Sequence, residues 1–292
     1  MNTTIGTALR NAVHYLTQHG IPEPRPAAEV LLADLLALPR SHLYLAANTP
    51  LSAAQHRLYK GRIKRRLRGE PVQYITGHQE FWSLEFEVNP QVLIPRPESE
   101  LLVEHGMRLG QQWCKEDRHL PLYLLDVGTG SGNLAISLAH VFPQSMVLGI
   151  DIAMGALCVA QRNARRLGVA ERLRWVCGDL VTPLRTDTRR FALCVSNLPY
   201  VTTVEWQHLP CEIRDYEPVG ALLGGRDGLD LIRRLIVAIP GVLAPGGGLL
   251  LEVGWQQATA VIDIIQQSGQ FRKSGVCRDF AGIERLVWAQ VP

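Results

Sequence analysis

The sequence reads Asp126-Val-Gly-Thr-Gly-Ser-Gly132 directly after a short apolar run at residues 122–125. The apolar run predicts a buried strand, and the residues after the glycines, 133–141, predict a helix. Glycines at such a turn let the backbone come close to a ligand that faces the N-terminus of the helix. A dinucleotide site has the spacing G-x-G-x-x-G, but here the third glycine comes one residue early. The shorter spacing favours a ligand that has no pyrophosphate.

From residue 121 onward, strands and helices are expected to alternate. The expected strands are 122–125, 146–150, 173–177, 191–195 and 249–253, with two more near 271 and at 286–291. The expected helices are 133–141, 154–167, 229–242 and 257–267. This alternation predicts an α/β fold, in which a mostly parallel, doubly wound sheet of seven strands carries helices on both faces.

Acidic residues follow the second and third expected strands, at Asp151 and Asp179. Ligands bind at the carboxyl ends of the strands in such sheets, so both are expected beside the glycine turn. A carboxylate at Asp151 is suited to accept hydrogen bonds from two ribose hydroxyls, and Asp179 is expected at the height of an adenine ring. These features together predict S-adenosylmethionine, in preference to NAD or a purely structural turn. The expected cofactor-binding residues are Gly128, Thr129, Gly130, Ser131, Gly132, Asp151, Asp179, Leu180 and Asn197.

The fourth expected strand, 191–195, is followed by Ser196-Asn-Leu-Pro-Tyr200. Pro199 has no backbone N–H and restrains Leu198 to extended geometry, so the strand is expected to stop here. The Asn197 side-chain oxygen and a neighbouring backbone carbonyl can together accept both N–H bonds of a planar –NH2 group. The pattern therefore favours a substrate with an amide or an exocyclic amine, and an ordinary turn at the end of a strand is the alternative.

Residues 1–70 predict helices with apolar residues on one face, and a fourth helix is expected to start at Ser52. Its inner face is expected to contain Leu58, Ile63 and Leu67. Its outer face is expected to contain Arg57, Lys60, Arg62, Lys64, Arg65, Arg66 and Arg68. Such a basic run is either a solvated helix face or a docking surface for a negatively charged macromolecule.

A β-hairpin is expected between this helical part and the sheet. Residues 81–88 alternate between apolar and other side chains, which predicts a strand, and the second strand is expected at 92–94. Arg96 follows between two prolines, which stiffen its backbone and aim its side chain. A simple surface ion pair is the alternative for this arginine.

The composition is that of a globular chain of 292 residues with a net charge of +3. The length suggests roughly two domains, and the small charge does not indicate a nucleic-acid-binding protein. No apolar run approaches the roughly 20 residues that span a bilayer, and the N-terminus lacks the features of a signal peptide, so a cytoplasmic location is expected. The six cysteines include no C-x-x-C pair, and we interpret them as reduced packing residues and expect no metal site.

Longer motifs also occur along the chain. They are Gly69-Glu-Pro-Val-Gln-Tyr-Ile-Thr-Gly77, Glu80-Phe-Trp82, Val92-Leu-Ile-Pro-Arg-Pro-Glu-Ser-Glu100, Glu217-Pro218 and Gly224-Gly-x-Asp-Gly-Leu229. With the glycine turn, Asp151 and the Asn197 motif, they resemble the HemK/PrmC family, the glutamine methyltransferases of bacterial peptide chain release factors. The resemblance covers nearly the whole chain. It implies a substrate-docking helical domain at 1–70, a β-hairpin linker at 71–97 and a class I, Rossmann-like methyltransferase domain at 98–292.

The resemblance implies a cytoplasmic, monomeric enzyme that transfers a methyl group from S-adenosylmethionine to the side-chain amide nitrogen of the glutamine in the GGQ motif of release factors. The implied catalytic residues are Asn197, Leu198, Pro199 and Tyr200. Asn197 and the Leu198 carbonyl would hold the amide, and Tyr200 would pack on its plane. The family usually has Asn-Pro-Pro-Tyr, so Leu198 is a departure, and we expect retained activity with lower efficiency.

Three alternatives stay open. The first is a glutamine methyltransferase of a ribosomal protein, because the same site would serve both substrates. The second is an adenine-N6 nucleic-acid methyltransferase, which would need a strongly basic groove and a flipped base; direct nucleic-acid binding is not expected here. The third is a cofactor-binding scaffold whose catalytic site has decayed at Leu198.

Overall fold

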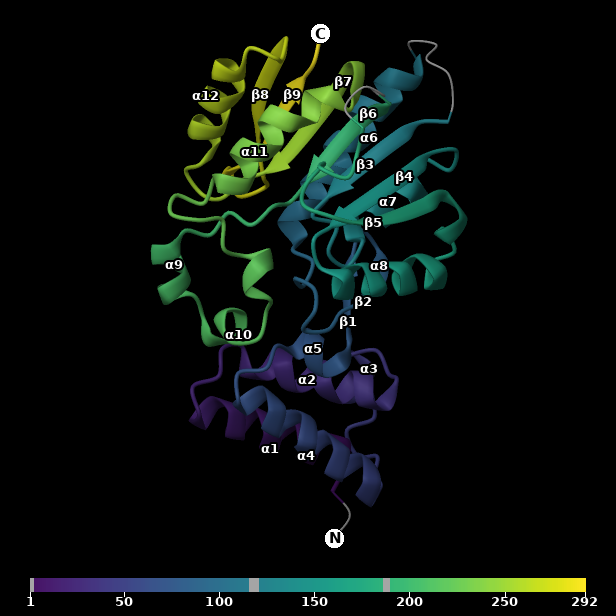
Figure 1. Cartoon of the computed structure of the whole chain (residues 1–292). Coiled ribbons are helices and arrows are strands. Elements are labelled where there is room, and N and C mark those ends of the chain that lie inside the picture. Colours follow the sequence, from purple (N-terminus) through teal and green to yellow (C-terminus); the bar gives the residue numbers. More distant parts are fainter. Residues whose placement is uncertain (1–2, 116–120, 186–189) are drawn as a thin grey trace. The chain divides into compact units, whose positions relative to one another are not determined.

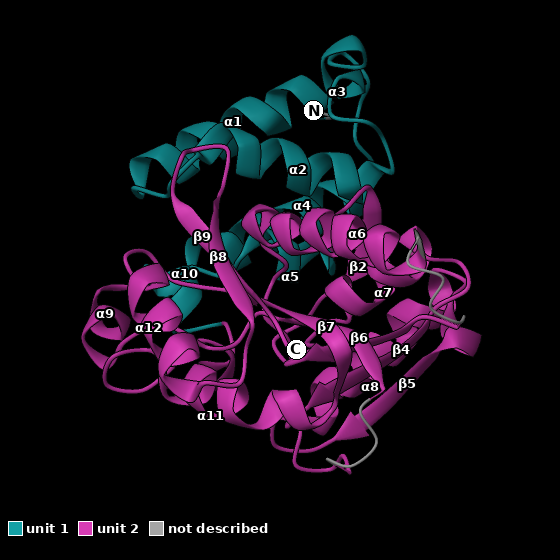
Figure 2. Cartoon of the chain, turned by 90° about the horizontal axis from the view of Figure 1, so that it is seen from above, with its two compact units in different colours: residues 1–78, 210–216 teal, residues 79–209, 217–292 magenta. Residues whose placement is uncertain are grey.

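The computed structural model of the chain describes residues 3–115, 121–185 and 190–292. The chain forms two compact units, residues 1–78 with 210–216, and residues 79–209 with 217–292 (Figure 2). The first unit thus ends after His78, whereas the sequence places the end of the helical domain near residue 70. It also includes the segment 210–216, which follows the Asn197 motif in the chain.

The first unit is helical (Figure 1). Its helices are α1 (Ile5–Gln18), α2 (Pro24–Leu36), α3 (His42–Leu45), α4 (Ala53–Leu67), α5 (Val72–Thr76) and α10 (Cys211–Arg214). Small and branched apolar side chains of α1 and α2 pack with Tyr59 and Ile63 of α4. The Tyr59 hydroxyl donates to the Ala28 carbonyl at 2.9 Å, so this buried polar group keeps a partner. Helix α4 begins as predicted, with Ser52 as the N-cap of a capping box with Gln55.

The basic helix α4 differs from its predicted pattern. Three of its arginines are paired within the unit, Arg62 with Asp34, Arg65 with Glu70, and Arg66 with Glu212. Arg66 is buried, so its placement on the outer face was wrong, and Leu58, expected on the inner face, is 58% exposed. The helical periodicity could not reveal these acidic partners, because they lie outside α4: Asp34 in α2, Glu70 just after α4, and Glu212 in the distant segment 210–216. The basic side chains that remain exposed are Arg57, Lys60, Lys64, Arg65 and Arg68.

The β-hairpin consists of β1 (His78–Phe81) and β2 (Leu84–Glu87). Trp82 and Ser83 form the turn with φ of 53° and 56°, as in the two-residue turns that match the twist of a hairpin. The predicted strands at 81–88 and 92–94 were therefore wrong, because the turn falls inside the first range and the second range forms no strand. Residues 72–76, within the predicted linker, form helix α5.

The second unit contains a seven-stranded sheet within the described residues, in the order β5-β4-β3-β6-β7-β9-β8. The strands are β3 (Tyr123–Val127), β4 (Met146–Asp151), β5 (Leu173–Cys177), β6 (Phe191–Ser196), β7 (Leu243–Glu252), β8 (Lys273–Arg278) and β9 (Glu284–Gln290). Strands β3 to β7 run parallel, and β9 is antiparallel to both β7 and β8. The predicted α/β fold is confirmed. The strand order reverses between β3 and β6, which is where ligands bind in such sheets.

Helices cover both faces of this sheet (Figure 1). They are η1 (Pro97–Ser99), α6 (Glu100–Lys115), α7 (Asn133–Val141), α8 (Met154–Arg166), α11 (Asp230–Ala238) and α12 (Ala258–Ser268), with α9 (Thr203–His208) in the connection after β6. Leu193 packs into the core with α6 and α7, and its neighbour Cys194 into the core with α11 and α12. Since both faces are covered, all six residues of β6 are buried. None of the described helices has the length and apolar content needed to cross a membrane.

Two smaller expectations were wrong. Residues 245–248, expected as a turn before a strand at 249–253, lie within the longer strand β7. Of the six cysteines interpreted as packing residues, Cys194 is buried as expected, but four are exposed, Cys114, Cys158, Cys177 and Cys211.

Candidate active site

The glycine turn between β3 and α7 has a backbone shape that side chains disfavour. Its glycines all have positive φ, 76° at Gly128, 55° at Gly130 and 82° at Gly132. Beneath the turn, the buried Asp126 accepts hydrogen bonds from Thr129 Oγ1 at 2.6 Å and from the Ala135 N–H at 3.1 Å. Its Oδ1 has no hydrogen-bond partner among the described residues. Burial raises the pKa of Asp126 to about 7, against the opposing effect of these two hydrogen bonds.

The two acidic strand ends have different surroundings. Asp151 accepts the Gly130 N–H at 2.8 Å and the Ala153 N–H at 2.9 Å, so its carboxylate holds the glycine turn against the end of β4. Burial raises the pKa of Asp151, and these backbone hydrogen bonds oppose the rise. Asp179 instead forms an ion pair with Arg234 of α11 at 2.5 Å.

A cavity opens in the second unit where these strands end. The predicted residues that line it are Gly128, Thr129, Gly130, Ser131, Asp151, Asp179, Leu180, Asn197, Leu198 and Pro199. Two other predicted site residues are not part of this lining. A Cβ on Gly132 would lie within 3.2 Å of Ile136, Ala160 and Trp175, so this glycine is needed for close packing. Tyr200 follows the lining residues, and its hydroxyl points to Glu252.

Sequence reasoning did not assign Ser99 or Ile152 to the site, although both line the cavity. Ile152 carried a usable signal, because an apolar residue directly after a strand-ending acid is well placed to contact a nucleoside base. Ser99 carried none, since a serine in a Pro-Glu-Ser-Glu run reads only as the start of a helix.

The lining fits S-adenosylmethionine. Ile152 is 71% exposed at the cavity, an apolar surface that a flat purine ring would cover. The neighbouring Asp151 offers carboxylate oxygens to hydroxyl groups. The unpartnered oxygen of Asp126 beneath the turn suits a positively charged group above it.

The Asn197 motif begins where β6 ends. Ser196 Oγ donates to the Val127 carbonyl at 2.6 Å, which ties the end of β6 to β3. The Asn197 side chain donates from Nδ2 to Ser99 Oγ at 3.0 Å. Neither Asn197 Oδ1 nor the Leu198 carbonyl accepts a hydrogen bond from any described residue. Two adjacent acceptors are therefore left for a ligand.

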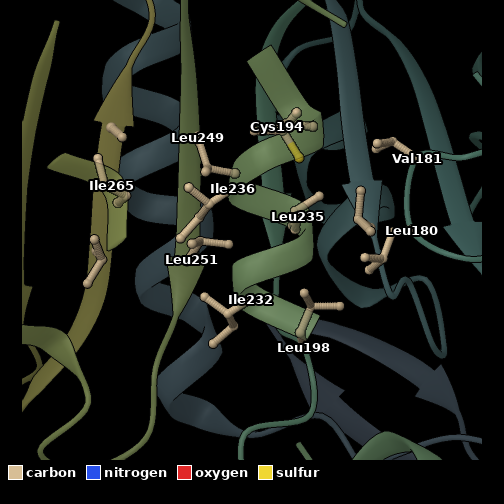
Figure 3. Close-up of a cluster of buried hydrophobic side chains, with 14 of the residues drawn as sticks. Leu180, Val181, Cys194, Leu198, Ile232, Leu235, Ile236, Leu249, Leu251 and Ile265 are labelled. Carbon is tan, nitrogen blue, oxygen red and sulfur yellow. The ribbon is translucent and has the colours of Figure 1, made fainter. Parts of the chain in front are cut away.

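The Leu198 side chain packs into the hydrophobic core beside α11 (Figure 3). It is buried with Leu180, Ile232 and Leu235. Full burial of a leucine side chain is worth about 1.5–3 kcal/mol. The buried side chain therefore anchors the backbone of Leu198 to the core.

A glycine loop at residues 224–228 braces the backbone of the motif. A Cβ on Gly228 would lie 2.1 Å from the Tyr200 carbonyl oxygen, and one on Gly224 would lie 2.4 Å from the Pro199 carbonyl oxygen. The Tyr200 carbonyl also accepts a hydrogen bond from Gln257 Nε2 at 3.0 Å. The close approach explains why glycines stand in this motif.

Arg96 lines the cavity and pairs with a buried acid. Its Nη2 donates to Glu217 Oε1 at 2.5 Å, and the other oxygen of Glu217 accepts the Ile94 N–H at 3.1 Å. The arginine is thus more than a surface ion pair, because its partner carboxylate is buried and fixes the segment before η1.

Comparison with known proteins agrees with this geometry. Residues 7–77 match the PrmC N-terminal domain family, and residues 124–216 match a methyltransferase domain family. The chain is 42% identical over 286 residues to a release factor glutamine methyltransferase of Moorella thermoacetica, with 98% of each chain covered. It is 39% identical over 282 residues to the one of Geobacter sulfurreducens, with 95% of this chain and 93% of the relative covered.

A solved structure shares the fold. It is the T. thermophilus 16S rRNA N2 G1207 methyltransferase in complex with AdoMet and guanosine, with a TM-score of 0.52 and 18% identity over 74% of this chain and 50% of that chain. The methyltransferase domain and the lining of the cavity make S-adenosylmethionine the cofactor. Because the chain is similar to these relatives over nearly its full length, it belongs to the family of release factor glutamine methyltransferases.

Proposed function

We propose that this protein transfers a methyl group from S-adenosylmethionine to the side-chain amide nitrogen of the glutamine in the GGQ motif of peptide chain release factors. The observation that carries the proposal is the pair of free acceptors, Asn197 Oδ1 and the Leu198 carbonyl, at the cavity. The names of the full-length relatives support the substrate.

These two acceptors suit the chemistry of an amide. A glutamine amide nitrogen is a weak nucleophile, because its lone pair is delocalised into the carbonyl group. Asn197 and Leu198 would each accept one of its N–H bonds, which raises the electron density on nitrogen and fixes its direction. Placement and electrostatics then supply most of the rate acceleration. The Tyr200 ring would pack on the plane of the amide.

When bound, the cofactor would supply a methyl group from a positively charged sulfur, whose carbon–sulfur bond would break to leave a neutral thioether. As the nitrogen takes the methyl group it becomes cationic, and one of its protons leaves. A carboxamide oxygen and a backbone carbonyl are too weakly basic to keep that proton, so it passes to water. The two acceptors therefore act by orientation and by stabilising positive charge.

For the cofactor, we propose that Asp151 binds the ribose hydroxyls and that Ile152 and Leu180 cover the adenine. Residues 128–131 would approach the amino-acid part with their backbone. Asp179 has a smaller role than its position in the sequence indicates, because Arg234 already neutralises its charge. We further propose that the enzyme acts as a monomer in the cytoplasm, where its substrate takes part in translation.

The test uses the purified protein, methyl-labelled S-adenosylmethionine and a release factor. A matched release factor with the GGQ glutamine replaced by alanine is the control. Label is expected on the wild-type factor and not on the control. Label on a ribosomal protein or on adenine-containing DNA, with none on the release factor, would overturn the proposal in favour of that substrate.

A further inference from the structure

A buried carboxylate stands behind the Asn197 motif. Glu252, the last residue of β7, is 3% exposed. Its Oε2 accepts a hydrogen bond from Ser99 Oγ at 2.5 Å, and its Oε1 accepts one from the Tyr200 hydroxyl at 3.2 Å. Ser99 Oγ in turn accepts the Asn197 Nδ2–H at 3.0 Å. One carboxylate therefore contacts both Ser99, which holds Asn197, and Tyr200 of the same motif.

The hydrogen count of Ser99 decides which way the Asn197 carboxamide faces. A serine hydroxyl has one hydrogen to donate, and here that hydrogen is committed to Glu252. The Ser99 oxygen can then only accept, so it selects the nitrogen end of Asn197 and leaves Oδ1 for the substrate. If the Ser99 hydroxyl no longer donated to Glu252, it could donate to Asn197 Oδ1 instead. The Asn197 carboxamide would then flip, and its NH2 group would face the N–H of the substrate.

We propose that Glu252 and Ser99 are positioning residues, which fix the Asn197 side chain in the one orientation that accepts from the substrate amide and hold the Tyr200 ring. The expected effect on kcat rests on the proposed function. The expected orientation of the Asn197 side chain does not, because it can be measured on the protein without substrate.

The surroundings of Glu252 raise its pKa, because burial is the largest influence and the nearby Glu98 adds to it. The hydrogen bonds from Ser99 and Tyr200 and the charge of Arg285 oppose this rise and favour the ionised form. The role of Glu252 as an acceptor therefore rests on geometry, since the hydroxyls of Ser99 and Tyr200 both point to it. An apolar side chain would fill such a buried site at less cost than a carboxylate. Stability alone therefore gives little reason for an acid here, whereas orientation of two neighbours does.

The kinetic test compares Ser99→Ala with Ser99→Thr. Ser99→Ala is expected to lower kcat about 10- to 100-fold, the range that follows from a misplaced reacting group, with a much smaller change in cofactor affinity. Ser99→Thr keeps the hydroxyl and is expected to recover most of that loss. Ser137 offers a matched control, because it is a buried serine of α7 whose Oγ has no partner among the described residues. Ser137→Ala should leave kcat at the wild-type value.

A double-mutant cycle separates positioning from a general structural effect. If Ser99 acts through Asn197, then Ser99→Ala should lower kcat no further in an Asn197→Ala background. Losses that multiply would overturn the positioning role. Glu252→Gln should reproduce the kinetic defect of Ser99→Ala, because its amide can donate to Ser99 and release the serine hydrogen.

A spectroscopic readout needs no substrate. In the ¹H–¹⁵N spectrum of the isolated protein, the side-chain NH2 pair that disappears in Asn197→Ala belongs to Asn197. That pair is expected to shift upfield and to exchange faster with water in Ser99→Ala, and to stay near its wild-type position in Ser99→Thr. An unchanged pair in Ser99→Ala would refute the inference even if methylation of the release factor succeeds. A wild-type protein that methylates no release factor, but shows the expected shift, would refute the proposed function alone.

Discussion

Gly228→Ala tests whether the glycine loop sets the position of the Tyr200 backbone. Gly228 has φ of +77°, where an alanine costs about 1–2 kcal/mol. The new Cβ would also lie 2.1 Å from the Tyr200 carbonyl oxygen, whereas a relaxed contact between carbon and oxygen is about 3.3 Å or more. The carbonyl or the glycine loop must therefore move by about 1 Å. The new Cβ would also lie 2.4 Å from Gln257 Nε2, which donates to the same carbonyl, so this hydrogen bond is disturbed as well.

A displacement of about 1 Å at a reacting site can lower the rate about 100-fold. We expect Gly228→Ala to lower kcat for methyl transfer by that order and to reduce the free energy of unfolding. Gly168→Ala is the matched control, because Gly168 has φ of +74° and nothing within 4 Å of an added Cβ. In urea unfolding, the control should lose only about 1–2 kcal/mol, the cost of the backbone strain, and it should keep wild-type kcat. Equal kcat values for the two variants would refute the reasoning.

Four further substitutions test side chains of the second unit. The pKa of Asp126 is about 7 in the folded protein, against an ordinary value of 3.8. Between these pH values the folded state binds more protons than the unfolded state. The free energy of unfolding should therefore fall as the pH rises from 4 to 7, by at most about 4 kcal/mol. Asp126→Asn should remove this slope in urea unfolding followed against pH; a slope that persists would assign it to another group. Leu198→Ala should cost about 2–5 kcal/mol of unfolding free energy, because the buried side chain leaves a cavity; a loss below about 1 kcal/mol would show that the side chain is no anchor. Leu198→Pro should keep methyltransferase activity, since the carbonyl at this position is retained, and an inactive but folded variant would contradict the role given to that carbonyl. Asp151→Ala should weaken cofactor binding, measured by calorimetry, more than it lowers the rate at saturating cofactor, and the reverse order would contradict its assignment.

Much of the second unit could be predicted, because its elements have strong local signals. Helix α7 and strand β5 have the predicted limits. Gly132 precedes α7 and Pro143 follows soon after its end, while Arg172 and Gly178 bound β5. The cavity was likewise foreseen at the carboxyl ends of β3, β4 and β6. The order of motifs along the chain was enough for this, because a parallel sheet brings those strand ends together.

The remaining features depend on contacts that no local pattern records. The hairpin turn at Trp82 and Ser83 has positive φ without a glycine or an asparagine to mark it. Ser99 and Glu252 are 153 residues apart in the chain and meet only in the folded protein. Leu198, a departure from the family motif in the sequence, becomes an anchor only once α11 is placed beside it (Figure 3).

The measurement that tests the central claim most directly is the single-turnover rate of methyl transfer to the release factor by Asn197→Ala, with the cofactor dissociation constant determined on the same protein. Loss of one oriented hydrogen-bonding group at a reacting centre costs about 100- to 1,000-fold in rate. The account predicts a fall of that size with a cofactor dissociation constant close to that of the wild type. A rate near the wild-type value would contradict it, because the glutamine amide would then be held by some other group.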